Sequence, residues 1–318
     1  MGVLNGAWHF LSPHCIGHIY FLQAGLVLMP AELLYDAKAY LGEGPVWDAR
    51  SQTLYWLDIL NKRIFANADL LLELDGLAGC LAPRKNGGLV LALSNADEGR
   101  FRFAGFEMES TKLTLISALE NELPGNRFND GKCDPRGRFI AGTMDLAENA
   151  PTGSLYSFDG RSITKLLSGI SISNGLTWSP DHKTFYYIDT PTREVRAFDY
   201  DLESGAIANP RVVVSVHESL GWPDGMTSDT QGNLWIAMWG GAQVTKWDPH
   251  TGGLLEQIPV PALNVSSCIF GGKDLSELYI TSARKGLDEA ALARYPLTGG
   301  VFRLETNVEG MPTFEFTG

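Results

Sequence analysis

Four short segments of the sequence carry a polar side chain followed directly by glycine. The pairs are Glu43-Gly44, Asp130-Gly131, Asn174-Gly175 and Asp224-Gly225. Each glycine lies 8 to 10 residues before the first residue of a short aromatic run. One Asx-Gly pair by itself indicates only a turn. Four pairs at the same phase of a repeat indicate a shared position in the fold.

Three carboxylates and an amide gathered at one place would repel one another unless a cation joined them. Oxygen ligands favour a hard divalent ion such as Ca²⁺, Mg²⁺ or Mn²⁺, and zinc or iron also suits a site with open coordination positions. Two further repeats carry uncharged residues in the same slot, at 79–81 and 267–269. The pattern therefore predicts one divalent metal ion bound by side chains from several repeats.

Six aromatic or β-branched runs recur along the chain, with starts 35, 50, 46, 49 and 44 residues apart. These runs are expected strands at 54–59, 89–94, 139–144, 185–190, 234–239 and 278–283. A second strand is expected after each, at 63–67, 100–105, 154–159, 194–199, 243–248 and 301–305. A unit of about four strands repeated in this way is typical of a propeller. We therefore predict an all-β, six-bladed β-propeller over 29–318, closed by pairing of 31–40 with 300–316.

The first 28 residues differ from the rest of the chain. They are largely apolar, but the first basic residue is Lys38, so the positively charged start of a secretory signal is missing. Gly, His and Pro interrupt the run before about 20 apolar residues accumulate, which argues against a membrane span. We interpret 1–28 as a flexible extension or the product of an upstream start site.

The charge balance excludes several classes of partner. The chain has 25 basic and 37 acidic residues, a net charge of −12, which argues against binding to nucleic acid or an anionic membrane. The cysteines at 15, 80, 133 and 268 show no paired spacing, so we expect neither disulfides nor a zinc–thiolate site, and a cytoplasmic location. Because a propeller closes its own sheet edges, a monomer or weak homodimer is expected.

Five long motifs together resemble the gluconolactonase/regucalcin family, also called senescence marker protein-like. They are LGEGPVWD at 41–48, RFNDGKCDPRGRFIAGTM at 127–144, ISNGLTWSPDHKTFYYIDT at 172–190, PDGMTSDTQGNLWIAMWGG at 223–241 and FGGKDLSELYITSARKG at 270–286. The resemblance covers about 31–318. It implies a six-bladed propeller that uses a divalent ion at the channel mouth to hydrolyse sugar lactones.

The resemblance also implies roles for individual residues. Glu43, Asn174 and Asp224 would be the metal ligands, and Asp224 would also accept and donate the proton. Arg127 and Asn129 would contact the substrate. This chain departs from the family after the GTM motif, where ungapped spacing places Ala147 at the position of a sugar-contacting glutamate and Glu148 one residue later. Whether Glu148 contacts the substrate, and hence the sugar preference, stays open.

Three functions remain distinct possibilities at this point. The first is metal-dependent hydrolysis of a five- or six-carbon aldonolactone, with the metal polarising the carbonyl and Asp224 as general acid/base. The second is a related propeller hydrolase acting on other esters or organophosphates. The third is a non-enzymatic calcium-binding or interaction propeller. Trp222 and Trp239 flank the Asp224 segment and are candidates for the pocket wall.

Overall fold

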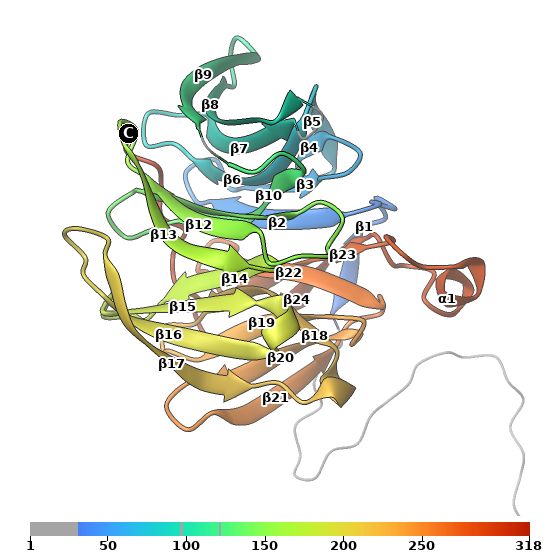
Figure 1. Cartoon of the computed structure of the whole chain (residues 1–318). Coiled ribbons are helices and arrows are strands. Elements are labelled where there is room, and N and C mark those ends of the chain that lie inside the picture. Colours follow the sequence, from blue (N-terminus) through green and yellow to red (C-terminus); the bar gives the residue numbers. More distant parts are fainter. Residues whose placement is uncertain (1–30, 96–97, 121) are drawn as a thin grey trace, which may run out of the picture.

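Six small antiparallel sheets arranged in a ring form the molecule, as the computed structural model shows (Figure 1). The structure describes residues 31–95, 98–120 and 122–318. Each sheet has four strands, which confirms the predicted all-β, six-bladed propeller. The predicted N-terminal extension, 1–28, lies outside the described residues. No helix in the described part of the chain is both long and apolar enough to span a membrane.

Strands run outward from the channel in sequence order within each of the first five blades. The first blade comprises β2 (Gly42–Asp48), β3 (Thr53–Asp58), β4 (Arg63–Ala66) and β5 (Asp69–Glu73). The second comprises β6 (Leu77–Pro83), β7 (Leu89–Asn95), β8 (Arg100–Glu107) and β9 (Lys112–Leu119). The third comprises β10 (Asn126–Cys133), β11 (Phe139–Asp145), β12 (Gly153–Phe158) and β13 (Ile163–Ile170). The fourth comprises β14 (Ser173–Trp178), β15 (Thr184–Asp189), β16 (Glu194–Tyr200) and β17 (Ile207–Ser215). The fifth comprises β18 (Trp222–Ser228), β19 (Leu234–Trp239), β20 (Gln243–Asp248) and β21 (Gly253–Pro259).

The sixth blade closes the ring by joining the two ends of the described chain. It comprises β22 (Asn264–Gly271), β23 (Glu277–Ala283), β24 (Val301–Glu305) and, as its outermost strand, β1 (Glu32–Tyr35). Glu32 pairs with Arg303 and Leu33 with Phe302. The predicted closure between the start and the end of the propeller is therefore confirmed.

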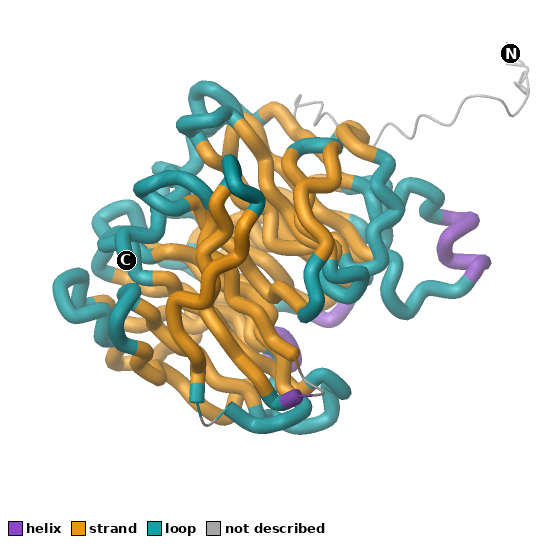
Figure 2. Tube along the Cα trace, turned by 90° about the horizontal axis from the view of Figure 1, so that it is seen from above, coloured by secondary structure: helices purple, strands orange, loops and turns teal. Residues whose placement is uncertain are grey.

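Short helical segments lie between the strands. The α-helix α1 (Glu289–Arg294) projects from the ring of strands (Figures 1 and 2). The 3-10 helices η2 (Thr190–Thr192) and η3 (Glu218–Leu220) follow β15 and β17. The first of them, η2, contributes a residue to the candidate site.

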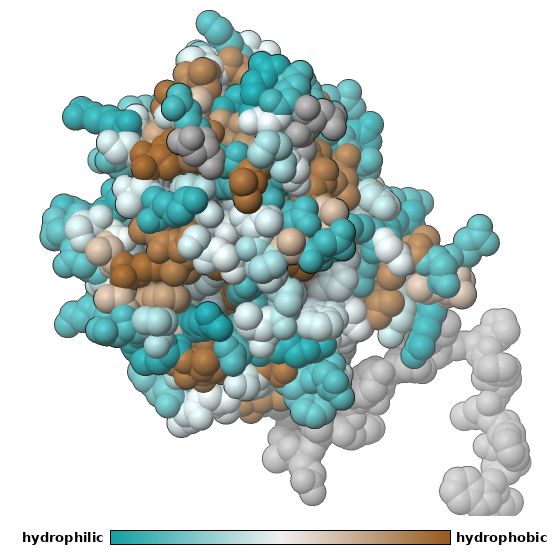
Figure 3. Space-filling model, viewed as in Figure 1, coloured by the Kyte–Doolittle hydropathy of each residue, from teal (hydrophilic) through white to brown (hydrophobic). Residues whose placement is uncertain are grey.

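The hydrophobic core is divided among the interfaces between neighbouring blades. Phe103 of the second blade stacks on Phe158 of the third, with ring centroids 4.5 Å apart. Trp47 of the first blade likewise stacks on Tyr279 of the sixth, at 5.3 Å. Aromatic side chains from different strands thus form contacts between neighbouring blades and hold the blades together around the channel. Some of the large apolar side chains that remain exposed, such as Leu115 and Leu255, lie on outer strands. Hydrophobic patches on the face in Figure 3 are separated by hydrophilic side chains.

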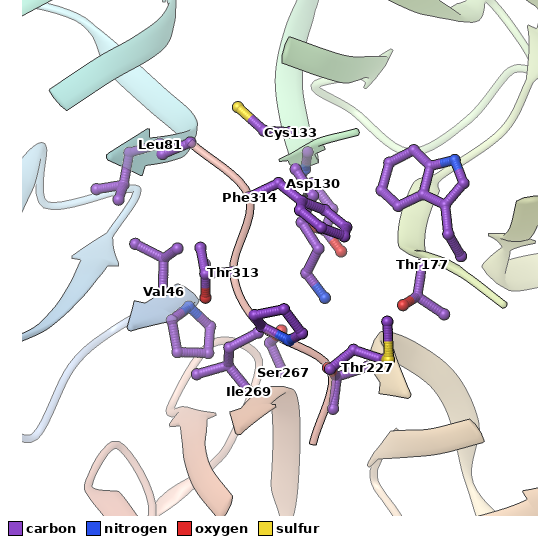
Figure 4. Close-up of a pocket in the computed structure, with 18 residues that line it drawn as sticks. Val46, Leu81, Asp130, Cys133, Thr177, Thr227, Ser267, Ile269, Thr313 and Phe314 are labelled. Atoms are coloured by element: carbon purple, nitrogen blue, oxygen red, sulfur yellow. Dashed lines mark hydrogen bonds between the residues drawn. The ribbon is translucent and has the colours of Figure 1, made fainter. Parts of the chain in front are cut away.

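A C-terminal strap, residues 306–318, crosses the channel on the face opposite the candidate site. Gly310 bridges to Asp229 of the fifth blade, and Phe316 bridges to Arg84 after β6 of the second. The Phe316 ring is buried and stacks on Phe158 at 5.5 Å. Figure 4 shows Thr313 and Phe314 of the strap among side chains of the inner strands. The strap therefore covers one end of the channel.

Every inner strand has a register shift against its neighbour near the level of the polar–glycine pairs. The shifts fall between Glu43 and Val46, Ala78 and Cys80, Phe128 and Gly131, Asn174 and Leu176, Pro223 and Met226, and Val265 and Ser267. A bulge adds one residue to a strand and redirects the side chains beside it. In the blades that carry a polar–glycine pair, the bulge lies beside that pair and interrupts the regular alternation of side chains along the inner strand.

Candidate functional site

One cavity of about 440 Å³ contains all five residues predicted for the site. Glu43 lies on β2, Arg127 and Asn129 on β10, Asn174 on β14 and Asp224 on β18, so four of the six blades contribute. All five side chains are buried. The structure therefore brings these five side chains together at one end of the channel.

The glycines after these polar residues permit close packing of the inner strands. A Cβ atom on Gly175 would lie 2.6 Å from the carbonyl oxygen of Asp224, and one on Gly225 would lie 2.6 Å from the Cα of Ser267. Real Cβ atoms do not approach backbone this closely, so only glycine lets the neighbouring strands meet there. At Gly175 and Gly225 the pairs thus mark close approaches between neighbouring inner strands, which a simple turn interpretation does not explain.

A chain of hydrogen bonds joins the amide side chains of the site. Arg127 Nη1 donates to Asn129 Oδ1 at 2.6 Å, and Asn129 Nδ2 donates to Asn174 Oδ1 at 2.9 Å. Asn174 Nδ2 then donates to the Thr190 hydroxyl at 2.7 Å. That hydroxyl donates to the carbonyl oxygen of Pro223 at 2.8 Å. The orientation of both amides is thereby determined by their partners.

The two site carboxylates lie in an environment that disfavours their negative charge. Burial, followed by the charge of Asp130, raises the pKa of Glu43 to about 8. Burial, followed by the charge of Glu43, raises the pKa of Asp224 well above its usual range. Asp224 Oδ1 is buried and has no hydrogen-bond partner among the residues that the structure describes. A buried carboxylate oxygen without a donor is costly unless a cation or proton neutralises it.

The donor set fits a hard divalent ion. Glu43 and Asp224 supply carboxylate oxygens, and Asn174 supplies an amide oxygen, which are the ligand types that such ions prefer. Within the described ranges, no group of three or more His, Cys, Asp or Glu side chains is arranged to hold a metal. The candidate set thus consists of two carboxylates and one amide, and it leaves coordination positions for water or substrate.

The prediction that all four polar residues of the polar–glycine pairs share one site is wrong for Asp130. It lines a separate, deeper cavity of about 40 Å³ between the inner strands and the strap (Figure 4). The bulge between Phe128 and Gly131 makes Asn129 the residue that faces the candidate site. Lys132 lines the same deeper cavity and donates to the carbonyl oxygen of Met226. Asp130 therefore occupies the same position in the repeat as Glu43, Asn174 and Asp224, but its side chain lines a different cavity.

Further residues complete the cavity wall. Trp222 and Trp239 both line it, as their positions beside Asp224 suggested. The Arg193 guanidinium lies 3.5 Å from the centroid of the Trp222 ring and holds this half-exposed side chain in place. Glu148, the residue left open after the GTM motif, also lines the cavity.

Thr190 and Lys285 line the cavity as well, and sequence reasoning missed both. The sequence pattern predicts a strand over 185–190 that ends at Thr190, but β15 ends at Asp189 and Thr190 begins η2. Its place directly after a strand, at the level of the polar–glycine pairs, is the signal that could have found it. Lys285 follows β23 in a loop before α1 and lies within the motif at 270–286, but the motif gave it no individual role.

The fold and this site define a class: a six-bladed propeller with buried carboxylates and amides at one end of its channel. A family model described as "SMP-30/Gluconolactonase/LRE-like region" matches residues 41–284. The chain therefore belongs to the SMP-30/gluconolactonase/LRE-like family.

Individual relatives agree with this assignment. Regucalcin from Danio rerio is 40% identical over 296 residues, covering 90% of this chain and 98% of the relative. The solved structure of a calcium-binding protein, regucalcin, from Agrobacterium tumefaciens superposes with a TM-score of 0.83 at 30% identity, covering 91% and 97% of the two chains. A luciferin-regenerating enzyme superposes with a TM-score of 0.82 at 32% identity, covering 91% and 99%.

Proposed function

We propose that this protein hydrolyses sugar lactones to aldonic acids with a divalent metal ion bound by Glu43, Asn174 and Asp224. The observation that carries the proposal is the buried, unpartnered Asp224 Oδ1 beside a second buried carboxylate in a cavity of about 440 Å³. Membership in a family whose description includes gluconolactonase supports the reaction class. The relative described as calcium-binding supports a divalent ion as the cofactor.

When bound, a divalent ion supplies Lewis-acid polarisation of the lactone carbonyl. The Asp224 carboxylate takes a proton from the attacking water, whose oxygen forms the new bond to the carbonyl carbon. It then returns a proton to the ring oxygen as the ester C–O bond breaks. The product is the open-chain hydroxy acid, so atoms and charge balance without another reactant.

Arg127 and Asn129 orient the substrate in this proposal. Arg127 is buried and uses one guanidinium nitrogen, Nη1, for both Asn129 and the carbonyl oxygen of Phe128. A guanidinium has five N–H donors, so others remain for substrate oxygens. Holding the lactone ring near the general base lowers the entropic part of the barrier.

A proton-release assay on metal-stripped protein tests the proposal. It uses glucono-, galactono-, arabinono- and xylonolactone, with Ca²⁺, Mg²⁺, Mn²⁺, Zn²⁺ or Fe²⁺ added back singly. We expect turnover to return with metal and to fall by at least about 10²–10⁴-fold in Asp224→Asn, which keeps an oxygen ligand but loses the base. Asp199→Asn, in a surface ion pair with Arg211, is the matched control.

Near wild-type turnover in a folded, metal-loaded Asp224→Asn protein would refute the assigned base. Metal binding without turnover on any lactone would refute the hydrolase and favour a calcium-binding protein. Turnover confined to unsubstituted esters would favour a propeller hydrolase with a different substrate class.

A further inference from the structure

An ion pair spans the cavity between opposite sides of the ring. Lys285 Nζ pairs with Glu148 Oε1, and both residues line the cavity. Glu148 follows β11 of the third blade and Lys285 follows β23 of the sixth, which face each other across a six-bladed ring. Among the ion pairs of the described residues, this one alone joins two blades that are not neighbours.

The backbone on both sides holds the two side chains in position. The Lys285 N–H donates to the carbonyl oxygen of Tyr40 at 2.8 Å, and its carbonyl oxygen accepts from Asn264 Nδ2 at 3.1 Å. The Glu148 N–H donates to the carbonyl oxygen of Asp145 at 3.0 Å. Glu148 also has φ = 59°, a left-handed conformation that is unfavourable for glutamate. This turn conformation helps to direct the Glu148 side chain into the cavity that it lines.

The ion pair keeps free hydrogen-bonding capacity toward the cavity. A lysine ammonium has three donors and a carboxylate has about four acceptor sites, so one contact between them leaves others for a ligand. The side chains are 28% and 36% exposed, and pairs exposed to this extent contribute little to stability. Loss of Lys285 should therefore leave the fold intact.

We propose that Lys285 is a specificity-determining residue that, paired with Glu148, recognises adjacent hydroxyl groups of a polyhydroxylated lactone. The ammonium donates to one hydroxyl oxygen, and the carboxylate accepts from its neighbour. The proposal rests on the proposed function for the identity of the ligand as a lactone. It assigns the choice between hydroxylated and plain lactones to two residues that line the same cavity but lie outside the proposed set of metal ligands.

Equilibrium binding of lactams tests the proposal without requiring turnover. The probes are D-glucono-δ-lactam, which carries the ring hydroxyls, and δ-valerolactam, which lacks them; calorimetry measures both with the metal-loaded protein. We expect Lys285→Met to bind gluconolactam about tenfold more weakly and valerolactam unchanged, since one charged hydrogen bond is lost. Lys285→Arg should restore most of the affinity. Lys38→Met, which removes an exposed lysine paired with Asp36, is the matched control and should match the wild type.

Three outcomes would overturn the proposal: no binding of gluconolactam to the wild type, unchanged gluconolactam affinity in Lys285→Met, or equal loss of both lactams. Lactone hydrolysis is measured in parallel on the wild type. Absence of turnover together with the expected lactam discrimination would contradict the proposed reaction while leaving the assignment of Lys285 standing.

Discussion

Substitution of Thr190 by valine removes one hydroxyl that joins two parts of the site. The hydroxyl accepts from Asn174 Nδ2 at 2.7 Å and donates to the Pro223 carbonyl at 2.8 Å. Valine nearly keeps the shape of threonine, so the change removes two buried hydrogen bonds with little change in volume. At about 0.5–1.5 kcal/mol for each bond, we expect the free energy of unfolding to fall by roughly 1–3 kcal/mol.

The same substitution should weaken metal binding. Without the hydroxyl, the Asn174 amide keeps its bond from Asn129 but loses one of the two side-chain partners that fix its orientation. Loss of a hydrogen-bond partner behind a metal ligand typically costs about 10–100-fold in metal affinity. Titration calorimetry with Ca²⁺ and Mn²⁺ measures this effect, and urea unfolding of the metal-free protein measures the change in stability.

Thr192→Val is the matched control for this prediction. Thr192 lies in the same 3-10 helix and donates to the Asp189 carbonyl at 2.7 Å, but it does not line the cavity. We expect it to lose stability and keep its metal affinity. Equal metal affinity in Thr190→Val and the wild type would refute the idea that the hydrogen-bond chain orients Asn174. An equal loss of metal affinity in Thr190→Val and Thr192→Val would show that the effect is not specific to the Thr190 hydroxyl.

Two further predictions concern the packing that supports the site. Gly225→Ala places a Cβ 2.6 Å from the Cα of Ser267, so we expect a loss of about 1–3 kcal/mol in urea unfolding, and an unchanged midpoint would show that the inner strands can separate without cost. Phe316→Ala removes a buried ring that stacks on Phe158, and we expect a loss of about 3–5 kcal/mol; a loss below about 1 kcal/mol would mean that the strap contributes little to holding the blades.

The repeat was predictable because each blade carries its own complete set of local signals. The run from Leu54 and the run from Leu234 both form the second strand of a blade, as their aromatic residues and flanking turns indicated. The pairing of β1 with β24 followed from the need to close the ring. Burial of one sheet face and the turn between strands are local properties, so a single sequence is enough to predict them.

The details of the site depend on contacts between blades, which a periodic pattern does not contain. Asn129 and Asp130 are neighbours with similar chemistry, and only the bulge in β10 decides which of them faces the candidate site. Thr190 acquires its role through a carbonyl that lies 33 residues later in the chain. Lys285 meets Glu148 across 137 residues, and neither position shows this in its local sequence.

Ring closure also determines when the molecule can become functional during its synthesis. Glu32 of β1 meets Arg303 of β24 across 271 residues. At about 5–20 residues per second, a ribosome needs roughly 14–54 s to make that stretch. Until then β1 has no partner, and its open edge is accessible to other nascent chains and to chaperones. Glu43 leaves the ribosome early, but its position relative to Asn174 and Asp224 is fixed only when the last blade is made. The site is therefore expected to form only after the sixth blade has been synthesised.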